Sequence, residues 1–361
     1  MEYSEESLQM IAALADARGA SGFEDEVVAL ARKYAAPYAD LEEDKLRNLF
    51  IYRKKNTGSK PVIMLDAHSD EVGFMVHSVK PNGTLRVVNL GRWNNSSLPS
   101  SKVLVRNAEG KYIPGIFAAK PVHFMSAAER SASGNLPISE LVIDIGAVDK
   151  ADAVENYKIR MGEPVVPATK FEFDPEHGVF FGKAFDCRIG CAALLEILRR
   201  VDGVELPCDV VGVFSSQEEV GDRGCKVSVN HVRPDAAICL EGCPADDTFT
   251  ADYAIQTALK KGPMFRHMDV SVICSPRFQR FVLDTAQEGG LAVQESVREG
   301  GGNDAAVINT SLLGIPAVTA GIPVRYIHAM NCLASYYDFE ATVSLIVEVL
   351  KKLTPDVLAG F

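Results

Sequence analysis

The sequence predicts an α/β protein whose mostly parallel sheet has helices on both faces and is interrupted by an inserted small β domain. Three apolar runs, at residues 62–65, 210–214 and 236–240, are typical of strands buried on both faces of a parallel sheet. Segments with helical spacing separate such runs, and this alternation favours parallel pairing. Between residues 72 and 174, short alternating runs punctuated by Gly and Pro predict strands instead, with a polar loop at 126–135.

Length and composition agree with two folded parts. The chain has 361 residues, more than one simple core usually contains, and its 47% apolar and 24% charged residues are ordinary for a globular protein. We expect a domain built from residues 1–71 and 175–361, with residues 72–174 inserted between its two parts.

The charge balance excludes some classes of function. A net charge of −11 argues against nucleic-acid binding, because a protein that binds phosphate backbones needs a basic face. No apolar run approaches the roughly 20 residues of a membrane span. The first residues, MEYSEE, are acidic and do not resemble an export signal. We therefore expect a cytoplasmic protein without nucleic-acid or membrane partners, in which the eight cysteines are reduced thiols.

Helices at residues 4–17 and 23–36 are expected to open the chain. The first has apolar residues near helical spacing. Ser21 with Glu24 three residues later is the pattern of a capping box for the second helix. A strand pair is expected next, at residues 46–52 and 61–65, joined through a turn.

Two adjacent carboxylates, Glu218 and Glu219, follow the buried run at 210–214. In open α/β sheets, ligands bind beyond the carboxyl ends of the strands. One carboxylate placed there can bind a metal ion, and its neighbour can take a proton from a water on that ion. The alternative is a pair of solvated loop acids. The choice depends on whether ligand-type residues also follow the other predicted strands.

Other ligand-type residues occupy comparable places. His68, Glu241 and His328 each follow a predicted strand. Asp70, two residues after His68, is close enough to orient the imidazole. Asp186 precedes an apolar helix, where both an N-cap and a carboxylate that bridges two metal ions remain open.

The ligand types at these positions are two imidazoles and three carboxylates. This mixture suits Zn²⁺ or Co²⁺ and tolerates Mn²⁺. One carboxylate shared by two ions, with one His and one acid on each, would give two open sites that share a water. The candidate metal ligands are His68, Asp186, Glu219, Glu241 and His328.

Cysteines lie beside these candidates. Cys187 and Cys191 form one pair, and Cys239 and Cys243 form another, each with a three-residue gap. Structural zinc sites usually have tighter cysteine spacing, so a thiolate zinc site is the less favoured interpretation.

Six stretches of the chain resemble the M42 metallo-aminopeptidases, a family that includes glutamyl and deblocking aminopeptidases. They span nearly the whole chain in the family's order. The stretches are ASGFE at 20–24, HSDEVGF at 68–74, FDCRIGC at 185–191, QEEVGDRG at 217–224, GGNDA at 301–305 and RYIH at 325–328.

The resemblance implies a catalytic α/β domain interrupted by a β-barrel dimerisation domain. It also implies assembly from dimers up to dodecamers, and two metal ions in each subunit. By the same resemblance, Glu218 would be the general base and Asp70 the orienting acid. The implied ligands are His68, Asp186 and Glu241 for one ion, and Asp186, Glu219 and His328 for the other.

Two positions depart from the family pattern. The family usually has Asp where this chain has Glu241, which still supplies a carboxylate but is one methylene longer. Asp247 and Thr248 keep the downstream pattern in register and support that match. The family also usually has a second Asp where Cys187 stands, and we expect this change to alter local hydrogen bonding.

The expected function is removal of N-terminal residues from short peptides by a cytoplasmic, self-associating enzyme with two divalent ions, Zn²⁺ or Co²⁺, with Mn²⁺ as a third candidate. Glu218 would activate a water that bridges the ions. Three alternatives stay open: a deacylase or carboxypeptidase on the same scaffold, a glycoside hydrolase, and a non-catalytic assembly or binding relative. The intact ligand set argues against the last of these.

Overall fold

The computed structural model of the protein describes residues 3–126 and 137–361. It contains two compact units. The first comprises Met1–Glu71, Phe171–Ile327 and Cys332–Phe361, and the second comprises Val72–Lys170 and His328–Asn331. The loop expected at residues 126–135 falls, apart from Ser126, outside the described residues.

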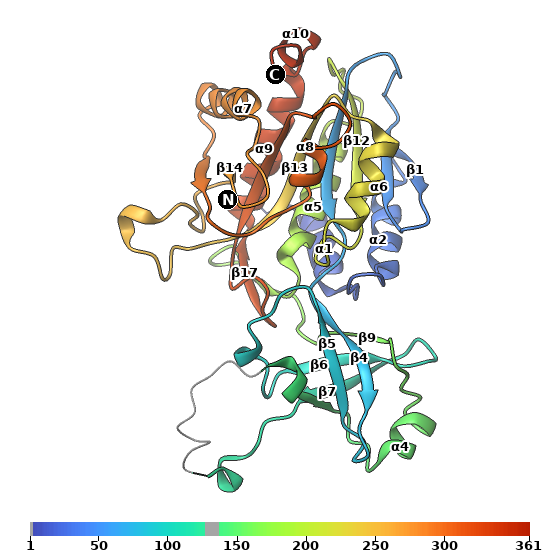
Figure 1. Ribbon diagram of the computed structural model, residues 1–361. Helices are drawn as coiled ribbons and strands as arrows, with labels where there is room; N and C mark the ends of the chain where they lie inside the picture. Colours follow the sequence, from blue (N-terminus) through green and yellow to red (C-terminus); the bar gives the residue numbers. More distant parts are fainter. Residues whose placement is uncertain (1–2, 127–136) are drawn as a thin grey trace. The chain divides into compact units, whose positions relative to one another are not determined.

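An 11-stranded sheet forms the centre of the first unit (Figure 1). Four parallel strands lie in its middle, so that their carboxyl ends meet at one edge. The predicted fold class is confirmed, with antiparallel strands added at the flanks. In spatial order, the central strands are β12 (Asp209–Ser215), β3 (Val62–His68), β13 (Ala236–Pro244) and β16 (Ala317–Arg325).

The predicted strand pair at residues 46–52 and 61–65 is wrong. Both strands exist, but β12 lies between them and pairs with each, because long-range burial rather than the short turn selects the neighbours. The flanking strands are β1 (Ala39–Glu43), β2 (Leu49–Arg53), β10 (Glu172–Asp174), β11 (Val179–Gly182), β14 (Met264–Met268), β15 (Gln294–Val297) and β17 (Cys332–Ser335).

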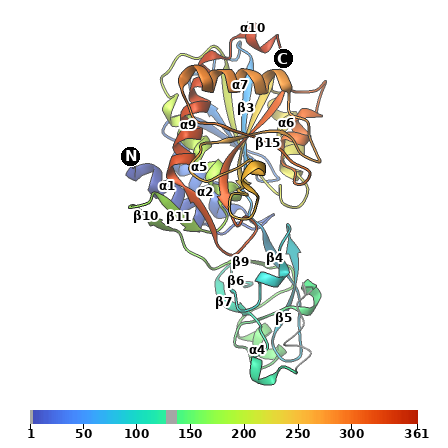
Figure 2. The ribbon, with the colours of Figure 1, turned by 90° about the vertical axis from the view of Figure 1, so that its left-hand side faces the viewer.

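Helices cover both faces of this sheet (Figure 2). Alternate residues of β3 divide between two apolar cores, with Ile63 and Leu65 in one and Met64 in the other. The first core receives α1 (Glu5–Asp16), α2 (Asp25–Ala35), α5 (Phe185–Arg200), α7 (Pro276–Gly289) and α9 (Tyr336–Lys352), and the second receives α6 (Arg223–Val232) and α8 (Ala305–Asn309). A short helix, α10 (Pro355–Leu358), lies near the C-terminus.

The second unit is a closed barrel of antiparallel strands. Phe74 in its core stacks on Trp93, with 4.8 Å between the ring centroids, and meets Phe117 edge-on at 4.9 Å. Its elements are β4 (Gly73–Val79), β5 (Leu85–Leu90), β6 (Lys102–Arg106), β7 (Tyr112–Phe117), β8 (Val142–Asp144), β9 (Pro164–Pro167) and α4 (Lys150–Glu155).

Among the described residues of both units, no helix combines the length and apolar character needed to cross a bilayer.

The predicted capping box at Ser21 and Glu24 is wrong. Helix α2 begins at Asp25, and neither side chain caps it. Ser21 Oγ instead donates a hydrogen bond to Asp70 Oδ2 at 2.6 Å, and Glu24 Oε1 accepts from the backbone N–H of Gln217 at 3.2 Å. Both residues are therefore engaged by segments that follow β3 and β12.

A buried ion pair holds the end of β3 to the start of α5. Lys183 Nζ lies 2.7 Å from Glu71 Oε1, and the two side chains are 2% and 1% exposed. Lys183 also donates to the carbonyl of Ala17 at 2.9 Å, and the N–H of Gly19 donates to Glu71 Oε1 at 3.1 Å. The contacts fix the chain after α1 beside the sheet edge.

We predict that Lys183→Met lowers the free energy of unfolding by about 3 kcal/mol, because buried Glu71 would lose its close cation and keep only Arg188, whose Nη2 lies 3.5 Å from Glu71 Oε1. Denaturant titration measures this change. Lys352→Met is the matched control, since its pair with Glu288 is 41% and 69% exposed and should contribute less than about 1 kcal/mol. Equal losses in the two variants would contradict the assignment.

Candidate metal centre

Strands β3 and β12 end side by side at the site. Ser215, the last residue of β12, pairs in register with His68, the last residue of β3. Beyond them, Asp70 Oδ1 accepts a hydrogen bond from the N–H of Glu218 at 2.9 Å, and Asp70 Oδ2 accepts from the N–H of Glu219 at 3.3 Å. The buried Asp70 carboxylate thus fixes the backbone of both glutamates.

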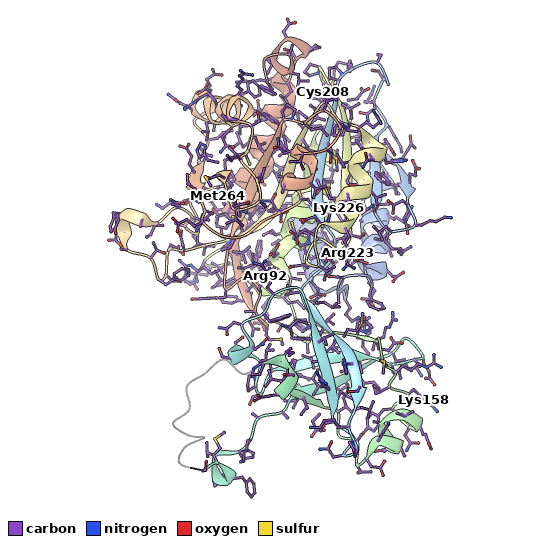
Figure 3. The ribbon with its side chains drawn as sticks, viewed as in Figure 1. Arg92, Lys158, Cys208, Arg223, Lys226 and Met264 are labelled. Carbon is purple, nitrogen blue, oxygen red and sulfur yellow. The ribbon has the colours of Figure 1, made fainter. Side chains whose placement is uncertain are left out.

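The loop that carries these glutamates is held by its own backbone and leads directly into α6. The carbonyl of Glu218 accepts from the N–H groups of Gly221 at 2.8 Å and Asp222 at 2.9 Å. Lys226, labelled on α6 in Figure 3, donates from Nζ to the carbonyl of Gly221 at 2.7 Å. The loop is therefore an ordered turn.

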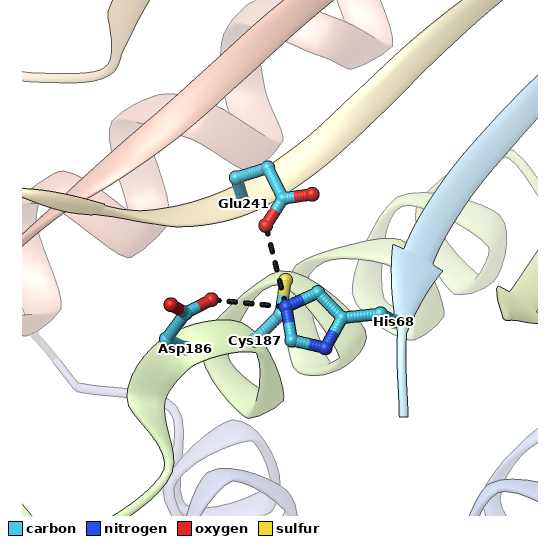
Figure 4. Close-up of side chains that lie close together, drawn as sticks. All are labelled: His68, Asp186, Cys187 and Glu241. Atoms are coloured by element: carbon cyan, nitrogen blue, oxygen red, sulfur yellow. Dashed lines mark hydrogen bonds and ion pairs between the residues drawn. The ribbon is translucent and has the colours of Figure 1, made fainter. Parts of the chain in front are cut away.

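The imidazole of His68 is surrounded by carboxylates (Figure 4). Its Nε2 lies 3.0 Å from Asp186 Oδ1, 3.6 Å from Glu241 Oε2 and 3.9 Å from Glu218 Oε2. On the other side of the ring, Nδ1 lies 3.3 Å from Asp70 Oδ1. Asp70 therefore contacts the imidazole and the glutamate loop at once.

One of these carboxylates lies in a place that the sequence did not predict, and another lies at the helix start, as predicted. Glu241 lies inside β13, which continues to Pro244, rather than beyond its carboxyl end. Asp186 has non-helical backbone angles of φ −85° and ψ 108°, and the helix shows no side-chain cap bond at its N-cap residue Ala184. Oδ1 of Asp186 faces His68 Nε2, as the metal-ligand interpretation requires.

The structure brings several candidate donors together. Donor atoms of His68, Asp186, Cys187 and Glu241 all lie within 4.8 Å of one another, and so do those of a second group, His68, Glu218 and Glu219. Cys187 joins them, although its three-residue gap to Cys191 made a thiolate zinc site the less favoured prediction. His328 belongs to the second compact unit, so its place as a ligand stays a prediction.

Two carboxyl groups near His68 have raised pKa values. Burial raises the pKa of Glu218 well above its usual value, with help from Glu219 and Glu241 and against the charge of His68. Burial, opposed by His68 and reinforced by Asp186, raises the pKa of Glu241 to about 8. Burial alone lowers the pKa of His68, but the groups around it, including Glu218 and Asp186, raise it well above its usual value. The cluster is therefore short of positive charge.

A divalent cation fits this environment. Glu241 is buried, and its Oε1 has no hydrogen-bond partner among the described residues. A buried polar atom without a partner is unfavourable by about 1–3 kcal/mol, and by more when charged. Imidazole nitrogen and carboxylate oxygen are ligands that Zn²⁺ and related ions accept. The donor types and the missing positive charge both match a bound metal ion.

A layer of polar residues beneath the ligands was missed from the sequence. Ser215 Oγ lies 2.6 Å from Asp304 Oδ2 and 3.2 Å from Asp66 Oδ2. Its single proton can serve only one carboxylate at a time, and burial raises the pKa of Asp66 to about 7. The available signal was an aspartate inside the apolar run that precedes His68.

The chain is similar to known aminopeptidases in both sequence and structure. The sequence model of the M42 glutamyl aminopeptidases matches residues 48–345. The chain is 32% identical to the glutamyl aminopeptidase of Lactococcus lactis subsp. cremoris, with 98% of each chain covered. Its structure matches a TET aminopeptidase from a marine sediment archaeon of the Thaumarchaeota with a TM-score of 0.93, 36% identity and 99% of both chains covered.

A second solved structure adds information on assembly. The TET1 peptidase of Pyrococcus horikoshii, described as able to assemble into a tetrahedron or a large octahedral shell, matches with a TM-score of 0.85 and 27% identity. The match covers 96% of this chain and 100% of that peptidase chain.

We predict that Glu241→Gln weakens Zn²⁺ binding by at least about tenfold. Loss of an outer hydrogen-bond partner of a metal ligand already costs about 10–100-fold in affinity, and the neutral amide removes a direct ligand. Isothermal titration measures the change. Glu205→Gln is the control, because that carboxylate is 82% exposed and pairs with Lys60. Unchanged affinity in Glu241→Gln would exclude Glu241 as a ligand.

Proposed function

Because the chain belongs to the M42 glutamyl aminopeptidase family, we propose that it is a metallo-aminopeptidase that removes N-terminal residues from short peptides with two divalent ions. Family membership supports a peptidase activity. The observation that carries the proposal further is the buried set of imidazole and carboxylates at the sheet edge, which is short of positive charge. Zn²⁺ and Co²⁺ are the favoured ions, with Mn²⁺ as an alternative.

In this proposal, Asp186 is shared between the two ions. His68 and Glu241 complete the first site, and their donor atoms already lie close to that of Asp186. Glu219 and His328 complete the second, with His328 following the carboxyl end of β16 in the chain. When bound, the ions polarise the scissile carbonyl and lower the pKa of the attacking water.

Glu218 acts as the general base in this proposal. Its carboxylate lies 3.9 Å from His68 Nε2, it is not one of the proposed ligands, and its backbone is fixed by Asp70. It accepts a proton from the attacking water and then donates that proton to the nitrogen of the leaving amine, so the net proton count is unchanged. Asp70 orients both His68 and the loop of Glu218.

Self-association into dimers and larger assemblies, up to a dodecamer, completes the proposal. It is supported by the shells described for the TET1 peptidase of Pyrococcus horikoshii. Native mass spectrometry tests it, and a purely monomeric protein would contradict it.

The class of substrate is tested with matched peptides. We predict that zinc- or cobalt-loaded protein cleaves the first residue from peptides with a free amino terminus and leaves their N-acetylated counterparts intact. Mass spectrometry of the products separates the alternatives. Release of an acyl group would indicate a deacylase, and loss of the last residue would indicate a carboxypeptidase.

The role of Glu218 is tested by Glu218→Gln. The amide keeps the shape of the side chain but cannot accept the proton, so kcat should fall on the order of 10²–10⁴-fold. Bound metal, measured by atomic absorption, should stay at the wild-type level because Glu218 is not a proposed ligand. Near-normal turnover in this variant would rule out the assignment.

A further inference from the structure

Cys187 lies among the proposed metal ligands. Its Sγ is one of the four donor atoms, with those of His68, Asp186 and Glu241, that lie within 4.8 Å of one another. Figure 4 shows its sulfur beside the imidazole nitrogen that faces both carboxylates. The side chain is fully buried, so its position is set by the site rather than by solvent.

We propose that Cys187, as a thiolate, is a fourth ligand of the ion held by His68, Asp186 and Glu241, and that it makes this position select zinc-like ions over Mn²⁺. The inference rests on the proposed metal centre but not on the reaction catalysed there. The family usually has an aspartate at this position, so the sulfur departs from the family pattern.

The donor set and its spacing support this ligand. One nitrogen, two oxygens and one sulfur are four donors of types that zinc accepts, and a catalytic zinc can expand to five ligands, which leaves a place for the attacking water. Metal–ligand bonds of about 2.0–2.3 Å place tetrahedral donors roughly 3.3–3.7 Å apart. His68 Nε2 lies 3.0 Å from Asp186 Oδ1, slightly closer than that spacing, and 3.6 Å from Glu241 Oε2, within it.

The carboxylate of Glu241 also points to an ion at this place. Glu241 Oε1 is buried and has no hydrogen-bond partner among the described residues, although Oε2 of the same carboxylate faces the imidazole. An ion between Glu241, His68 and the sulfur would satisfy this carboxylate. The sulfur therefore lies in the same donor group as a carboxylate oxygen that lacks a hydrogen-bond partner among the described residues.

Without an ion, the thiol has a different partner. Cys187 Sγ donates a hydrogen bond to the carbonyl of Leu240 at 2.9 Å, directly before Glu241 in β13. On metal binding, the S–H bond breaks, the proton passes to solvent, and a sulfur lone pair forms the bond to the cation. The hydrogen bond explains how the sulfur is held beside the other donors before an ion arrives.

A thiolate changes which ions the site prefers. Soft sulfur ligands favour zinc-like ions, whereas carboxylate and water ligands suit Mn²⁺. An aspartate at position 187, as in the family pattern, would supply hard oxygen instead. Cys187→Asp should therefore bind Zn²⁺ less tightly than the wild type while losing little affinity for Mn²⁺.

Cobalt-loaded full-length protein provides the test, in oxygen-free buffer without added thiols. The wild type should show a near-ultraviolet sulfur-to-cobalt charge-transfer band. Cys187→Ser and Cys187→Asp should lose that band. Their Zn²⁺ affinity should fall at least about tenfold, because losing a residue that only hydrogen-bonds to a metal ligand already costs about that much. Cys191→Ser is the matched control, because its buried sulfur contacts the carbonyl of His68 at 3.1 Å but lies outside the donor group.

Some results of these measurements would exclude the cysteine ligand alone, and others would exclude the whole metal centre. Cobalt bound to the wild type without the band, or a band that survives in Cys187→Ser, would overturn the cysteine ligand and leave the aminopeptidase standing. A wild type that binds no cobalt would overturn the ligand and the metal centre together. Cadmium-113 NMR of the wild type, whose shift separates sulfur from oxygen ligation, decides the question even where the variants fail to fold.

Discussion

The site depends on burying several acids around one imidazole. Carboxylates taken out of water are unfavourable by several kcal/mol each unless opposite charge is near. His68 and Arg266 oppose the charge of Glu241, yet burial still raises its pKa to about 8, and the pKa of Glu218 is raised as well. Divalent cations at this place would balance the charge and satisfy the oxygen of Glu241 that has no hydrogen-bond partner. Electrostatics thus supports the metal centre that we propose from family membership.

The rest of the first unit holds this arrangement in place. Parallel pairing of β3 with β12 puts His68 and Ser215 at the same level, so both strand ends open onto one edge. Asp70 then joins the imidazole to the glutamate loop, and the buried pair of Glu71 with Lys183 fixes the neighbouring chain. Because these contacts are buried, the donors are positioned before any ion binds.

The sequence predicted what local patterns determine. Apolar runs located the central strands, and the residues that follow them identified His68 and the Glu218–Glu219 pair. Local patterns could not predict which distant segments contact one another. Strand β12 lies between two strands that are close in sequence, and Ser21 bonds to Asp70 instead of capping a helix. Glu241 lies inside its strand because β13 continues beyond the apolar run. Cys187 joins the donors although its spacing from Cys191 argued against a thiolate site, because the fold rather than the spacing decides which side chains meet.

Anomalous scattering from crystals grown with Zn²⁺ tests the central claim most directly. Data on both sides of the zinc absorption edge would locate the ions without reference to activity. The account predicts a peak within bonding distance of His68, Asp186 and Glu241, and a second peak bonded to Asp186 and Glu219. Well-ordered density for these side chains with no anomalous peak among them would contradict it.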